Sequence, residues 1–227
     1  MKHNLFGFFA ALLLTSSVHA LSVAELSGKD ASGGLKEALS QGASKAVMVL
    51  GTNDGFLGNP KVHIPLPESM QKIEGLLRGV GMGKQADELI TAMNRAAEAA
   101  VPEAQTLLVN AVKQMSIEDA KGILTGGEDA ATQYFRRATS ASLTWKFLPI
   151  VRRAIAKVQL AEKYDSFAGK AAKFGLVKET DTRLENYVTQ KTLDGLYLMI
   201  ATEEKAIRTD PAGAAGKLAQ KVFGVLK

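Results

Sequence analysis

The chain has 227 residues, 28 Lys and Arg against 23 Asp and Glu, and no cysteine. The missing cysteines exclude disulfide bonds, thiol catalysis and thiolate metal sites. A length near 200 residues is typical of one domain, or of one domain with an appendage.

The N-terminus has the three parts of a secretory signal. Lys2 and His3 form a basic start, an apolar run covers 5–14, and small residues end the stretch at Ala20. The apolar run is shorter than the roughly 20 residues that a membrane span needs, and no other segment of the sequence approaches that length. We therefore expect cleavage after Ala20, export without a transmembrane anchor, and a single helical domain over 21–227.

Helical periodicity dominates the rest of the sequence. Apolar residues recur every three or four positions over 35–50, and Gly51 ends that pattern. The same spacing predicts further helices over 68–80, 84–101, 102–115, 117–126, 128–164, 181–207 and 211–223. The predicted fold class is all-α, a single compact bundle of roughly seven to nine helices.

One long segment, 51–67, interrupts this pattern. It holds three glycines, three prolines and an Asn-Asp-Gly turn signal, which together exclude a helix. Val62, Ile64 and Leu66 alternate with polar residues or proline, so we expect an extended course with one face on the core. Long ordered loops are often functional, and this loop is therefore a candidate for presenting a site.

Four local features carry structural predictions. Ser116 with Asp119 forms a capping box at the start of a short helix. Pro149 lies inside a helical pattern, which predicts a kink or a break near 146–148. Gly195 suggests a close helix crossing, and Glu204 is spaced to pair with Arg208.

The catalytic inventory is short. Beyond the signal, His63 is the only histidine, so a two-histidine metal pair and an HExxH zinc site are excluded. Ser69 to Lys72 matches the SxxK pattern but lacks its SDN and KTG partners, and it is better interpreted as a first helical turn. We predict no catalytic residue, no metal site and no cofactor from the sequence.

Polar residues suggest one ligand site. Asn94 and Glu98 are four residues apart on one helix face beside Arg95, and facing inward they could coordinate a ligand or a cation. The alternative is a solvent-side pair, or Glu98 neutralised by an arginine. Together with Asn53 and Asp54 of the loop, they are the ligand-binding candidates. We expect the loop to frame this site by packing Phe56, Val62, Ile64 and Leu66 onto the helices.

Positive charge is concentrated in 136–178, with ten Lys and Arg against two Asp and Glu. A solvated face balanced by acidic flanks explains this stretch, and so does a site for an anionic lipid, a polysaccharide or an acidic protein. Nucleic acid is a poor expectation for an exported protein. Aromatic residues accompany the basic ones, including Trp145, although aromatics at helical spacing more often belong to the core. The anionic-partner candidates are Arg136, Arg137, Arg152 and Arg153.

Several sequence blocks together resemble an exported bacterial family, domain of unknown function 4197. They are GLKEAL at 34–39, NDGF…NP…VHIPLP at 53–67, MNRAAEAA at 93–100, ATQYFRRATSASL at 131–143, YVTQKTLDGLYLMIATEEKAIRTDP at 187–211 and KVFG at 221–224. The resemblance implies an exported helical protein of Gram-negative bacteria, hence of the periplasm. It implies no particular activity.

Two classes of function remain open. One is a non-catalytic binding or interaction protein that meets an anionic envelope component through the basic stretch. The other is a hydrolase or transferase that uses Asp54, Glu98 or Glu203 as acid or base. A deep pocket around the loop and its helix would favour the enzyme, and a shallow basic surface would favour the interaction protein.

Overall fold

The computed structural model describes residues 28–79, 81, 83–158, 161–162, 164 and 183–210. The described residues form helices and no strand, which confirms the all-α class, with the helix count at the low end of the expectation. The predicted signal with its cleavage after Ala20, the helix start at Asp181 and the final helix over 211–223 lie outside the described residues.

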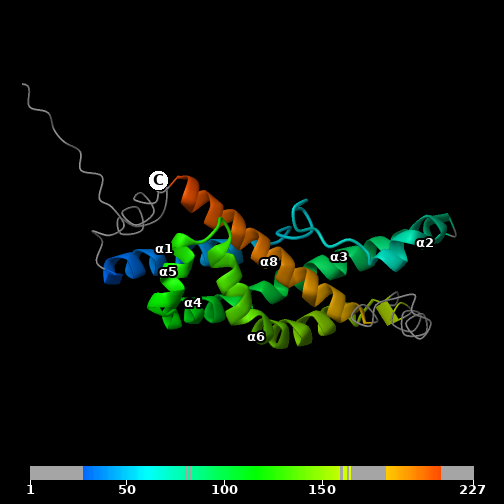
Figure 1. The fold of residues 1–227 in the computed structure, drawn as a ribbon. Helices are drawn as coiled ribbons and strands as arrows, with labels where there is room; N and C mark the ends of the chain where they lie inside the picture. The colour runs from blue at the N-terminus through cyan, green and yellow to red at the C-terminus, as the bar shows by residue number, and fades with distance from the viewer. Residues whose placement is uncertain are drawn as a thin grey trace, which may run out of the picture.

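From α1 to α6 the helices follow one another through short connections apart from the 51–67 loop. Their bounds are α1 Gly28–Leu50, α2 Glu68–Gly79, α3 Gly83–Ala100, the 3-10 turn η1 Val101–Glu103, α4 Ala104–Gln114, α5 Ile117–Thr125, α6 Ala130–Ile155 and α8 Leu184–Thr209. Figure 1 shows α8 running across the molecule beside α6, with α2 and the start of α3 extending toward one end.

The core forms where α6 and α8 pack together and receive α3 on one side and α1 on the other. Its largest buried side chains come from all of these helices and from the loop. Burial of each such side chain stabilises the fold by roughly 1.5–3 kcal/mol. Residues with less than 2 % exposure include Leu35, Leu50, Phe56, Met93, Phe135, Phe147 and Tyr197.

Two helix starts are fixed by carboxylates. The predicted capping box of α5 is confirmed: Asp119 N donates to Ser116 Oγ at 3.0 Å, and Ser116 N donates to Asp119 Oδ2 at 3.1 Å. The start of α6 has no local side-chain cap, and its backbone donors at Ala131 and Thr132 bond instead to Glu204 of α8, at 3.0 and 2.9 Å. A carboxylate at a helix N-terminus is electrostatically favourable, so Glu204 links α8 to the beginning of α6. The predicted pair of Glu204 with Arg208 is also present, at 2.9 Å.

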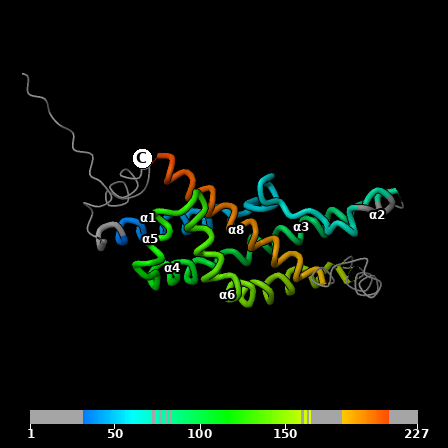
Figure 2. Tube along the Cα trace, in the orientation of Figure 1, coloured from blue at the N-terminus to red at the C-terminus, as the bar shows by residue number. Residues whose placement is uncertain are grey.

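Pro149 does not break its helix. Of the two outcomes expected there, the break near 146–148 is wrong, because α6 is one helix from Ala130 to Ile155. Its path is not straight, since the tube in Figure 2 changes direction along α6. Phe147 and Val151 on either side of the proline are both 0 % exposed, and this packing compensates for the hydrogen bond that proline cannot donate.

The buried side of α6 winds around the helix. Every fourth residue is buried, and because a turn takes about 3.6 residues, each step of four rotates the buried side by about 40°. The rotation follows the change of neighbours along α6, which packs on α4, α5, α3 and α8. The buried row is Ala131, Phe135, Thr139, Leu143, Phe147, Val151 and Ile155.

The 51–67 loop crosses α3 and α8 instead of standing away from the helices. Gly195 of α8 lies against it: a Cβ at this position would meet Phe56 Cε1 at 2.8 Å and Val62 Cβ at 3.3 Å. The predicted helix crossing at Gly195 is therefore wrong in its partner. The missing side chain admits a loop phenylalanine, not a second helix.

Candidate functional site

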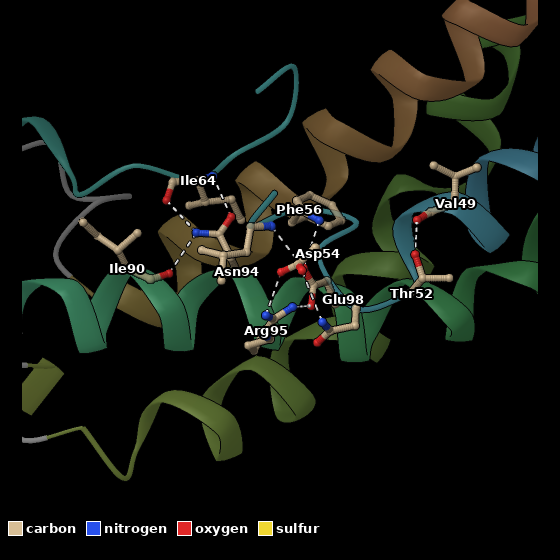
Figure 3. Close-up of polar contacts among 11 residues, drawn as sticks. Val49, Thr52, Asp54, Phe56, Ile64, Ile90, Asn94, Arg95 and Glu98 are labelled. Atoms are coloured by element: carbon tan, nitrogen blue, oxygen red, sulfur yellow. Dashed lines mark hydrogen bonds and ion pairs between the residues drawn. The ribbon is translucent and has the colours of Figure 1, made fainter. Parts of the chain in front are cut away.

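Asn94 of α3 is 0 % exposed and binds the loop backbone (Figure 3). Its Oδ1 accepts from Ile64 N at 2.8 Å, and its Nδ2 donates to Ile64 O at 2.9 Å and to Ile90 O at 2.8 Å. The side-chain amide therefore pairs with both backbone groups of Ile64, as a neighbouring strand would.

Glu98 lies one turn further along α3 and binds the other end of the loop. Its Oε1 accepts from Phe56 N and Leu57 N, both at 3.0 Å, and its Oε2 accepts from Arg95 Nη1 at 2.6 Å. The side chain of Glu98 is 6 % exposed. Two backbone donors, one buried and one part-buried, and one guanidinium thus surround this carboxylate.

Arg95 completes the group by reaching Asp54, whose Oδ1 accepts from Arg95 Nη2 at 2.7 Å (Figure 3). Hydrogen bonds to Glu98 and to Asp54 raise the pKa of the Arg95 guanidinium above its ordinary value. Asp54 has φ 65, in the left-handed region that aspartate tolerates better than most residues. We call Asn94, Arg95 and Glu98 the loop clamp.

Apolar packing reinforces the loop clamp. Phe56, Val62, Ile64 and Leu66 are between 0 % and 7 % exposed, which confirms that the loop packs these four residues onto the helices. Tyr187 of α8 also donates to Pro65 O at 3.0 Å. The loop is therefore held by α3 and α8 along most of its length.

The structure brings together three of the four ligand-binding candidates. Arg95 links Asp54 to Glu98, and Asn94 lies one turn away from Glu98 on α3. Asn53 is exposed, and of the other three candidates it contacts Asp54 only, at 3.3 Å. The inward polar atoms of Asn94 and Glu98 are engaged with backbone groups of the loop. In the described part of the chain no group of three His, Asp or Glu residues could hold a metal ion.

Surface hollows among the described residues also occur away from the loop clamp. One, of about 630 Å³, lies between α1 and α8 and is bordered by Met48, Glu203 and Ile207. Another, of about 430 Å³, lies along α3 beside Asp87 and Glu88. Neither of these hollows is lined by a residue of the loop clamp.

The second candidate surface is on α6, whose 26 residues include five basic side chains and no acidic one. Arg136 lies against α8 and is half-buried, with its Nη1 3.5 Å from Asp194 and its guanidinium 4.6 Å from the centre of the Tyr197 ring. Arg152 lies 3.5 Å from Glu185 yet keeps 59 % of its side chain exposed. Within the described residues, Arg137 and Arg153 are exposed and make no ion pair. The other basic candidates of 136–178 lie mostly outside the described residues.

Trp145 departs from the expectation that aromatic residues on α6 are core. It is 77 % exposed, whereas Phe135 and Phe147 are 0 % exposed. A sequence signal for this exists: Trp145 is two residues from both Leu143 and Phe147, so it lies about 200° around the helix from their buried row.

We define the Trp145 face as the exposed residues of α6 that surround this side chain. Arg137 and Arg153 are each eight residues from Trp145, so they flank it at about 80° to either side and about 12 Å along the axis. Arg152, seven residues on, is nearly in line with the tryptophan. The exposed members of the Trp145 face are Arg137, Ala138, Ala141, Ser142, Trp145, Pro149, Arg152 and Arg153.

Comparison with known proteins assigns the chain to a family. The family described as "Protein of unknown function (DUF4197)" matches residues 25–224, most of the sequence, so the chain belongs to this family. No curated protein and no solved structure matches the chain. Among the described residues, no helix is both long enough and apolar enough to cross a membrane.

Proposed function

We propose that this chain, as a member of the DUF4197 family, is a non-catalytic interaction protein of the periplasm that contacts an anionic component of the cell envelope through the Trp145 face. One observation carries the proposal: a tryptophan that is 77 % exposed stands on a helix with five basic and no acidic side chains. A large exposed aromatic beside cations is a feature of interaction surfaces.

Charge supports the choice of an anionic partner. Arg137 and Arg153 have no acidic partner among the described residues, so their fields are not cancelled locally. A surface of one sign attracts an oppositely charged partner during diffusion and raises the rate of association. Binding through this surface should become weaker as salt is added, because salt screens exposed charges.

The state of the carboxylates favours binding over catalysis. Glu98 accepts three hydrogen bonds and is 5 % exposed, which leaves it no approach to a substrate. Glu203 is paired with Lys45 at 2.8 Å, and Asp54 with Arg95 at 2.7 Å. A general acid or base has to come within hydrogen-bond reach of its substrate. Each of the three carboxylates proposed for this role already has a cationic partner, and Glu98 is in addition buried.

Export is part of the proposal and has its own test. The basic start, the apolar run and the small residues up to Ala20 support a cleaved signal. We expect N-terminal sequencing of periplasmic protein to begin at Leu21. A cytoplasmic protein that still begins at Met1 would overturn the periplasmic assignment.

Binding itself is tested with a soluble polyanion. Trp145 is the only tryptophan of the chain, so its fluorescence reports on this face directly. Dextran sulfate should change the emission and neutral dextran should not, and added salt should reverse the change. Arg137→Gln/Arg153→Gln should weaken the response. The matched control is Lys84→Gln/Lys121→Gln, which removes the same charge from exposed positions on α3 and α5.

A further inference from the structure

We infer that the anionic component is the surface of a phospholipid bilayer, with the Trp145 side chain entering the headgroup region and the arginines beside it bonding lipid phosphates. This inference rests on the proposed function and makes it specific. It follows from the shape and the chemistry of the Trp145 face.

Small side chains surround the centre of the Trp145 face. Trp145 is surrounded along the helix by Ala138, Ala141 and Pro149, all exposed, so the indole projects beyond small neighbours. A protein partner gains most from a side chain that enters a well-packed pocket enclosed by further contacts. A single projecting indole suits a soft interface, and tryptophan is enriched where hydrocarbon meets lipid headgroups.

The cations are placed for a planar anionic surface. Arg137 and Arg153 leave the helix on opposite sides of Trp145, about 12 Å before and after it along the axis. Their long side chains can lie along the surface while the guanidinium groups stay in the polar layer. A guanidinium bonds phosphate in a bidentate manner, which makes lipid phosphate a suitable partner.

In the part of the chain that the structure describes, the helices around α6 leave this face exposed. The opposite side of α6 is occupied by the buried row that includes Leu143 and Phe147, both 0 % exposed. Arg136 is on that inner side, against Tyr197 and Asp194, so it takes no part in the contact. The result is a peripheral mode in which α6 lies on the membrane surface.

The experiment uses the purified chain and vesicles of two compositions, pure phosphatidylcholine and an equimolar mixture with phosphatidylglycerol. We expect co-sedimentation with the mixed vesicles, a blue shift of the Trp145 emission, and quenching by lipids brominated in their acyl chains. Each basic residue near an anionic surface contributes a factor on the order of five, so Arg137→Gln/Arg153→Gln should weaken binding by about 25-fold. Lys84→Gln/Lys121→Gln should change it far less, and Trp145→Ser should reduce partition without altering the helix signal in circular dichroism.

Further outcomes of these experiments distinguish a failure of the inference from a failure of the proposed function. Binding of dextran sulfate without binding of mixed vesicles overturns the bilayer and leaves the proposed function standing. Binding of neither overturns both. Equal binding to pure phosphatidylcholine, an equal response to soluble glycerol phosphate, or vesicle binding with unchanged Trp145 emission would each overturn the inference.

Discussion

The loop clamp on α3 and the Trp145 face on α6 hold most of the polar residues that the sequence singles out, and the two groups differ in how far they are buried. In the loop clamp, Asn94 and Glu98 are at most 5 % exposed and bond to backbone groups of the loop. On the Trp145 face the indole is 77 % exposed, and Arg137 and Arg153 have no ion pair among the described residues.

The polar groups of the loop clamp form hydrogen bonds within the fold, whereas those of the Trp145 face remain exposed to a partner. A buried donor or acceptor without a partner costs roughly 1–3 kcal/mol, so a long loop on a helix surface needs polar side chains to receive its backbone. An exposed arginine needs no such partner within the protein. Stability should therefore depend strongly on the loop clamp, and binding to anions should depend on the Trp145 face.

The largest effect on stability is expected from Asn94→Asp. The new carboxylate places an oxygen where Nδ2 now donates to Ile64 O at 2.9 Å and Ile90 O at 2.8 Å. An uncompensated charge at this buried position should lower the free energy of unfolding by about 3–5 kcal/mol near neutral pH. Urea denaturation followed by circular dichroism measures the loss.

The loss in Asn94→Asp should also depend on pH. Burial and the two carbonyls raise the pKa of the introduced carboxyl above its unfolded value of about 3.9, so the native state holds the proton more tightly. The unfolding free energy of the variant should then fall as pH rises above about 4, relative to the parent chain. The same deficit at pH 4 and at pH 7 would contradict the burial of this side chain.

Glu98→Gln should be next in size. The substitution keeps one oxygen but turns an amide toward donors that now bond to a carboxylate, either Phe56 N and Leu57 N or Arg95. We expect a loss of about 2–3 kcal/mol in unfolding free energy. Glu88→Gln, exposed on the same helix, should change it by less than about 0.5 kcal/mol. Equal stability of the two variants would assign Glu98 to a role other than holding the loop.

Gly195→Ala tests the apolar side of the loop contact. The added Cβ would lie 2.8 Å from Phe56 Cε1, and the Phe56 ring is buried with little room to move. Overpacking costs typically 1–3 kcal/mol, and the better helix propensity of alanine offsets up to about 1 kcal/mol, so a net loss of about 1 kcal/mol is expected. Gly122→Ala on α5 meets no atom within 4 Å and should instead stabilise the chain. The opposite signs distinguish a contact from a general effect of glycine.

Much of the fold was predictable because it is local. The helices follow from apolar periodicity, the α5 start from Ser116 and Asp119, and the irregular loop from its glycines and prolines. The polar partners were not predictable. Phe56 N is 42 residues from Glu98 and Ile64 N is 30 from Asn94, and a backbone N–H is common to every residue except proline, so nothing in the sequence marks these two donors.

The same limit explains Gly195 and Trp145. The sequence shows that Gly195 has no side chain, but only the fold shows that Phe56 takes the space. For Trp145 the signal was present, since its spacing from Leu143 and Phe147 places it away from the buried row. It was overridden by the general tendency of aromatic residues to be buried.

The smallest effect on stability should come from the Trp145 face, and this makes the comparison decisive. Trp145→Ser removes a side chain that is 77 % exposed. Arg137→Gln/Arg153→Gln removes two charges that have no ion partner among the described residues. Each of these three substitutions should change the unfolding free energy by no more than about 0.5 kcal/mol. The urea denaturation curves of both variants, followed by circular dichroism, should match that of the parent chain. Arg137→Gln/Arg153→Gln should nevertheless bind dextran sulfate more weakly, and Trp145→Ser should co-sediment less with mixed vesicles. A marked loss of stability in Trp145→Ser would mean that the indole is covered within the fold, and its loss of binding could then no longer be attributed to a surface contact.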